Sequence, residues 1–149
     1  MTTGKTSGDE SADAKVTRIL GTADPHGSTG VIERLLLAAG EQRVDALAVV
    51  GDIGGGGDYR HLFGALARTS WPVFWVPGPA DVPLDRCMQE ARDLERGYAL
   101  VRAHGSVVSA AGGLLFAGFG GEITEDPPGR GPEKRLHFAR WEVEYRLGA

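Results

Sequence analysis

Cysteine is almost absent from this sequence of 149 residues, in which Cys87 is the only one. A single cysteine cannot form a disulfide within the chain, which favours a reducing compartment such as the cytoplasm. Long apolar runs are also missing, and none approaches the ~20 residues that a helix needs to cross a bilayer. The N-terminus lacks the apolar segment of a signal peptide. We therefore expect a soluble, cytoplasmic protein with no membrane partner.

Clusters of lysine and arginine are missing as well. The formal net charge is -4 at pH 7, and the sequence pI is about 5.5. Because binding to a nucleic-acid backbone needs grouped basic side chains, nucleic acid is not expected to be the main partner. The 42% of hydrophobic residues is enough to build a core, and the length predicts one domain.

The first residues differ in composition from the rest of the chain. Residues 1–14 are rich in Thr, Ser, Gly and Asp and contain almost no apolar side chain. Such a segment cannot offset its ordering entropy by burial, so we expect a disordered tail there. The domain is expected over residues 15–149.

Apolar runs and helical patterns alternate from residue 16 to about residue 94. The pattern predicts strands over 16–23, 44–50 and 71–76 and helices over 28–40, 59–67 and 84–94. This alternation is typical of an α/β fold with a mainly parallel sheet. Shorter strands are expected over 98–102, 105–109 and 114–118, then a loop over 119–129 and a helix over 132–147.

Three side chains with metal-binding chemistry follow the first two predicted strands. Asp24 and His26 follow the first strand, and Asp52 follows the second. Because ligands bind beyond the carboxyl ends of parallel strands, we expect the three to converge at one edge of the sheet. In an extended segment, residues two apart point the same way, so Asp24 and His26 could reach one ion. Oxygen and imidazole together suit Mn, Fe or Zn.

Other interpretations of these residues stay open at this point. Asp24 before Pro25 could begin a turn, and Asp52 could cap the next segment. The glycine run over 54–57 could cradle a phosphate in an unrelated nucleotide-binding module, although no Gly-x-Gly-x-x-Gly opens the first helix.

Three sequence blocks in order carry a resemblance to a known family. They are Thr22-Ala-Asp24-Pro-His26-Gly27, Val49-Val-Gly51-Asp52 and Val76-Pro-Gly78-Pro-Ala-Asp81. The series resembles the motifs of calcineurin-like metallophosphoesterases, over about residues 16–147. The resemblance implies an αββα sandwich that hydrolyses small phosphomonoesters or phosphodiesters with one or two divalent ions. It also implies that Asp24 and His26 bind the first ion and that Asp52 bridges two; it assigns no catalytic residue.

The chain departs from the family pattern in its third block. Pro79 and Ala80 stand where the family has an asparagine ligand and a histidine that can protonate the leaving group. The later histidine motifs of the family are missing. We expect His61 and His104 to lie on the surface and His137 to lie in the final helix, with no special role.

The chain is also shorter than a complete domain of this family. We expect it to form the N-terminal half of the sandwich, so that either the gene is truncated or another chain supplies the second half. A half-sandwich would expose apolar surface and tend to self-associate. Two main hypotheses remain: a metal-dependent phosphoesterase of full or reduced activity, and a non-catalytic module that binds a phosphorylated ligand or a protein.

Overall fold

The main sheet consists of four parallel strands in the order β1-β2-β3-β4. The computed structural model describes residues 17–54, 59–95, 100–109, 114–125 and 136–148, so the tail predicted over 1–14 lies outside the described residues. The strands of this sheet are β1 (Ile19–Ala23), β2 (Ala46–Val50), β3 (Val73–Val76) and β4 (Leu100–Arg102). The mainly parallel sheet expected from the sequence is therefore confirmed.

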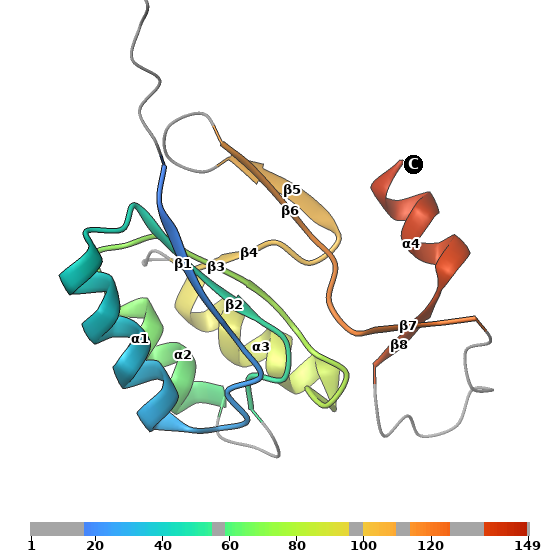
Figure 1. Cartoon of the computed structure of the whole chain (residues 1–149). Coiled ribbons are helices and arrows are strands. Elements are labelled where there is room, and N and C mark those ends of the chain that lie inside the picture. Colours follow the sequence, from blue (N-terminus) through green and yellow to red (C-terminus); the bar gives the residue numbers. More distant parts are fainter. Residues whose placement is uncertain (1–16, 55–58, 96–99, 110–113, 126–135, 149) are drawn as a thin grey trace, which may run out of the picture.

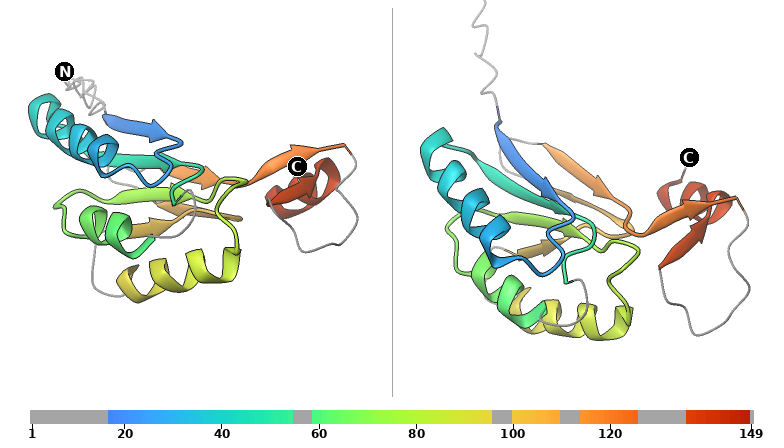
Figure 2. Two further views of the ribbon diagram at one scale, coloured as in Figure 1. Left: turned by 90° about the horizontal axis from the view of Figure 1, so that it is seen from below. Right: turned by 60° about the horizontal axis from the view of Figure 1, so that its bottom comes forward.

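Three helices cover one face of this sheet, as Figures 1 and 2 show. They are α1 (Thr29–Gln42), α2 (Tyr59–Ala67) and α3 (Leu84–Glu95), each between two successive strands. The core lies between sheet and helices and includes the fully buried side chains of Leu47, Val49, Val73 and Trp75. Alternate residues of these strands point to the opposite face, which needs a second covering layer.

A β-hairpin supplies that second layer (Figure 1). It pairs β5 (Ser106–Ser109) with β6 (Leu115–Gly118) in antiparallel register. The ring of Phe116 stacks on the ring of Phe74 with 4.9 Å between centroids. Gly118 allows close contact, because a Cβ there would lie 2.7 Å from Cγ1 of Val76. The hairpin thus covers β3 from the side opposite the helices.

The outer face of the hairpin is apolar and open to solvent. Val107 is 61% exposed and Leu115 is 68% exposed. Self-association of the chain stays a prediction, and we expect two copies to make contact through these two side chains.

The C-terminal part of the chain differs from the sequence prediction. Two short parallel strands, β7 (Glu122–Thr124) and β8 (His137–Ala139), pair with each other and precede α4 (Arg140–Leu147). The loop predicted over 119–129 is thus wrong where β7 forms. The helix predicted from residue 132 is wrong at its start, because 137–139 are extended and residues 132–135 lie outside the described part. Such three-residue strands depend on their pairing partner, which no local pattern reveals.

In the described part of the chain, no helix has the length and apolar character to span a membrane.

Candidate metal centre

Backbone hydrogen bonds hold the first two predicted metal-binding segments side by side. The strands β1 and β2 end in register, with Ala23 opposite Val50. Beyond the strands, the amide of Asp24 donates to the carbonyl of Val50 at 3.3 Å, and the amide of His26 donates to the carbonyl of Asp52 at 2.9 Å. The pairing therefore continues past the strand ends and fixes the two segments against each other.

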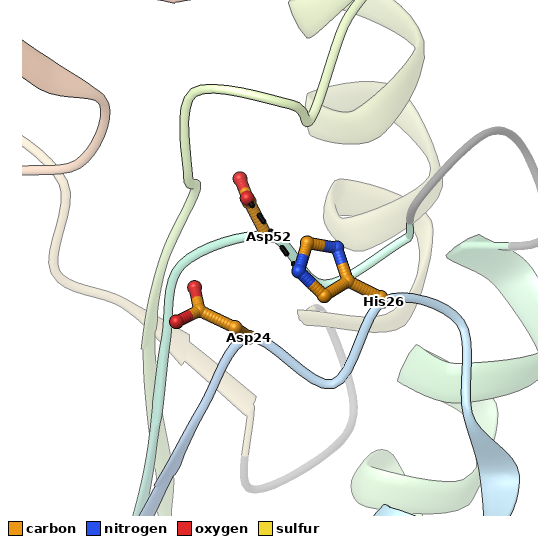
Figure 3. Close-up of side chains that lie close together, drawn as sticks. All are labelled: Asp24, His26 and Asp52. Carbon is orange, nitrogen blue, oxygen red and sulfur yellow. Dashed lines mark ion pairs between the residues drawn. The ribbon is translucent and has the colours of Figure 1, made fainter.

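The three predicted ligands converge at this edge of the sheet (Figure 3). One ligand atom from each of Asp24, His26 and Asp52 lies within 4.8 Å of the other two. Nε2 of His26 lies 3.9 Å from Oδ2 of Asp52. Because metal–oxygen and metal–nitrogen bonds measure about 2.0–2.2 Å, only small side-chain movements separate this arrangement from coordination of one ion. Two carboxylates and an imidazole match Mn, Fe or Zn.

The backbone at these residues is left-handed, not extended. The angle φ is 49° at Asp24, 45° at His26 and 35° at Asp52, and the described residues contain one other non-glycine with positive φ, Arg43. The predicted route to convergence, alternation along an extended segment, is therefore wrong, although the convergence itself is found. A left-handed conformation costs a non-glycine residue roughly 1–2 kcal/mol. Its concentration at these three positions is typical of a functional site held in place by its surroundings.

The buried side chain of Asp81 holds the segments around the centre in place. Its carboxylate is fully buried and accepts hydrogen bonds from three backbone amides. Ile53 donates at 2.9 Å, Gly54 at 2.8 Å and Gly78 at 2.8 Å. The side chain thus ties the segment after Asp52 to the turn that follows β3. The resemblance to the family implies a structural rather than a ligating role for Asp81, but the three amides that it binds could not be predicted from the sequence.

The turn that follows β3 also donates a hydrogen bond to Asp52. The amide of Ala80 donates to Oδ1 of Asp52 at 2.7 Å, which leaves Oδ2 directed toward His26. The carbonyl of Pro79 accepts from the amide of Leu136 at 2.7 Å. Neither Pro79 nor Ala80 offers a ligand side chain, and Asp24, His26 and Asp52 form the one group of this kind among the described residues. The metal-ligating side chains in this part of the chain therefore fit a single ion.

The other three histidines stand apart from the centre. His61 is exposed on α2, as predicted. His137 lies on β8, where only 17% of its side chain is exposed and Nδ1 is 3.5 Å from Oε2 of Glu122. His104 is half-buried, and its Nδ1 accepts a hydrogen bond from the amide of Gly120 at 2.9 Å. The prediction of a surface position is therefore wrong for His104, and the prediction of a helical position is wrong for His137.

The hydrogen bond from Gly120 makes His104 a pH-sensitive support. Burial lowers the pKa of His104 below its ordinary value of about 6.5, and the positive charges of Arg146 and Arg102 lower it further. Below about pH 6.5 the unfolded chain then takes up a proton that the folded chain resists. We expect the free energy of unfolding to fall as the pH drops through this range, as measured by urea titrations at pH 7.5, 6.5 and 5.5.

The variant His104→Asn provides the control, since its amide oxygen can accept from Gly120 but does not titrate. Its unfolding free energy should depend less on pH than that of the wild type between pH 7.5 and 5.5. Equal pH dependence in the two proteins would contradict a role for His104.

A pocket of about 230 Å³ borders the centre and includes Asp24 in its lining. A larger hollow of about 500 Å³ lies on α3 beside Arg102. Its lining mixes acidic and basic side chains and contains none of the three ligand residues. The smaller pocket is therefore the one connected to the metal chemistry.

Comparison with known proteins assigns the chain to a family. The profile of a metallophosphoesterase family of the calcineurin superfamily matches residues 57–149. The chain is similar to the crystal structure of TT1561 of Thermus thermophilus, with 29% identity, a TM-score of 0.82, and coverage of 89% of this chain and 61% of that one. A second solved structure has 22% identity and a TM-score of 0.78, with coverage of 88% and 62%. Among curated proteins, no match was found.

The chain belongs to the calcineurin superfamily of metallophosphoesterases. The resemblance drawn from the three motif blocks is thereby confirmed, and the unrelated nucleotide-binding module is excluded. The fold is the α/β arrangement of that superfamily, and the chain spans about three fifths of the length of each of the two solved structures. The profile match begins after Asp52, so the roles of Asp24, His26 and Asp52 depend on their geometry.

Proposed function

We propose that this chain is a metal-dependent phosphoesterase that hydrolyses a small phosphomonoester or phosphodiester. The observation that carries the proposal is the placement of ligand atoms from Asp24, His26 and Asp52 within 4.8 Å of one another. These residues would hold one divalent ion, with Mn, Fe and Zn as the candidates. When bound, such an ion polarises a phosphoryl oxygen and lowers the pKa of a water molecule.

The protein's own groups would prepare the site for that chemistry. The amide of Ala80 orients Asp52 through Oδ1, so that Oδ2 is the oxygen available to the ion. Asp24 and His26 are exposed, so a substrate can approach from solvent. Because the two carboxylates carry a formal charge of about -2 at pH 7, a divalent ion would neutralise them before an anionic phosphate approaches.

A non-catalytic role is the second candidate, and one observation favours it. The third block places Pro79 and Ala80 beside the centre, and neither side chain can carry a proton to a leaving group. In this alternative the metal centre would bind a phosphorylated ligand or a protein partner without turnover. The cytoplasmic location likewise stays a prediction.

Hydrolysis of bis-p-nitrophenyl phosphate and p-nitrophenyl phosphate with added Mn²⁺ separates the two candidates. For the enzyme we expect metal-dependent release of p-nitrophenol, reduced at least about 100-fold in His26→Ala, because even outer-shell partners of metal sites contribute 10–100-fold. The matched control is His61→Ala, an exposed histidine on α2, which should keep wild-type activity.

Metal retention without turnover of either ester would favour the binding module. Activity that survives in both His26→Ala and Asp52→Asn would show that the proposed site is wrong.

A further inference from the structure

Glycines contribute to the lining of the pocket beside Asp24, and they are Gly51, Gly78, Gly120 and Gly121. The pocket lies between the ends of β1, β2 and β3 and the segment that follows β6. A Cβ at Gly51 would lie 3.2 Å from Oδ1 of Asp24, and one at Gly120 would overlap the carbonyl oxygen of Pro77. A side chain at either position would therefore crowd the neighbouring loop. The glycines let the segments meet closely enough to form the pocket.

Apolar residues also line this pocket. They include Val50 at the end of β2, Val76 at the end of β3, and Phe119. Neighbouring rings hold Phe119 in place: its centroid is 4.7 Å from that of Phe138, edge to face, and 5.3 Å from that of His104. Phe119 is therefore fixed by aromatic packing that includes Phe138 of β8.

Charge and size limit what this pocket can accept. Asp24 is the one charged side chain in its lining among the described residues, and it is negative. Such a pocket offers no cation to a second phosphate group or to a phosphate chain. Its volume of about 230 Å³ is below the 300–1,000 Å³ of sites for drug-sized ligands and suits a group of about one ring.

We propose that this pocket receives an uncharged, ring-sized organic group of the substrate while the phosphoryl group faces Asp24, His26 and Asp52. The substrate class is then a phosphate ester of an aryl or heteroaryl group, rather than a polyphosphate or a multiply charged sugar phosphate. This inference rests on the proposed function, because it places the phosphoryl group at the metal centre.

Two non-hydrolysable probes test the inference on the Zn²⁺-loaded protein. Phenylphosphonate and methylphosphonate share the same anionic head, and they differ in the ring. We expect phenylphosphonate to bind about tenfold more tightly or better, because the ring leaves water for an apolar pocket. Calorimetric titration gives both dissociation constants without any turnover.

Variants of two exposed strand valines locate the preference. Val50→Phe fills the pocket and should bring the ratio of the two dissociation constants close to one. Val107→Phe, on the outer face of the hairpin, should keep the wild-type ratio. Equal binding of the two phosphonates by the wild type would overturn the inference and leave the proposed function intact.

A titration of the metal-free protein with phenol keeps the test decisive if Zn²⁺ does not bind. Apart from Asp24, the pocket is lined by apolar and glycine residues, so its shape needs no ion. Amide chemical shifts should change at Gly51, Gly120 and Gly121 and stay constant at Val107. Unchanged shifts at the three glycines would overturn the inference, whereas absence of both Zn²⁺ binding and phosphonate binding would count against the proposed function.

Discussion

Replacement of Gly78 by alanine should lower the free energy of unfolding by about 3 kcal/mol or more. A Cβ at this position would overlap the amide nitrogen and Oδ1 of Asp52 and lie 2.8 Å from its Cα. Backbone atoms cannot avoid the clash by changing rotamer, so the turn after β3 must move away from Asp52. That movement also stretches the hydrogen bond from Ala80 to Asp52. Thermal unfolding should report a midpoint at least about 6 °C lower.

Gly40→Ala is the matched control for this prediction. Gly40 lies in α1, is exposed, and has no heavy atom within 4 Å of the position that an added Cβ would take. Because glycine in a helix is less favourable than alanine by roughly 0.5–1 kcal/mol, this variant should be slightly more stable than the wild type. If Gly78→Ala unfolds at the wild-type midpoint, the close packing of the turn on Asp52 is wrong.

Removal of the Asp81 carboxylate should have a similarly large effect. In Asp81→Ala the amides of Ile53, Gly54 and Gly78 lose their buried acceptor at the same time. An unsatisfied buried donor costs about 1–3 kcal/mol, so the combined loss should reach about 3 kcal/mol or more. The segment after Asp52 would also lose its anchor, and the affinity for a divalent ion should fall together with stability. Urea unfolding and metal titration measure the two effects separately.

Two further variants separate the carboxylate from the general loss of a side chain. Asp81→Asn keeps the shape and one acceptor oxygen, so its stability should lie between those of the wild type and Asp81→Ala. Asp85→Ala removes an exposed aspartate in the first turn of α3, where the helix dipole contributes only about 0.3–1 kcal/mol. Equal losses in Asp81→Ala and Asp85→Ala would contradict the anchoring role.

The strands of the parallel sheet could be predicted from the sequence because each strand carried its own signal. The apolar run from Val44 to Val50 is typical of a strand buried on both faces, and Ala46–Val50 forms β2 in the centre of the sheet. The strands β7 and β8 carried no such signal. Glu122–Thr124 stands in a segment with glycines before it and prolines after it, and it becomes a strand only by pairing with residues 137–139. Tertiary contacts therefore determine whether such short strands form.

The site was predictable in its membership but not in its geometry. Asp24, His26 and Asp52 could be named because each follows a strand end. Their left-handed backbone could not be predicted, because it depends on the hydrogen bonds that join the loops. The third block shows a second limit. The side chain of Ala80 has no chemistry to offer, yet its backbone amide orients Asp52, and a backbone role leaves no trace in residue type.

The central claim, that Asp24, His26 and Asp52 bind a divalent ion, is tested most directly by metal analysis of the purified protein after incubation with Mn²⁺ or Zn²⁺ and dialysis. Mass spectrometry of the metal content should give about one ion per chain for the wild type and for His61→Ala. His26→Ala and Asp52→Asn should retain far less. Equal metal content in all four proteins, or none in the wild type, would contradict the claim.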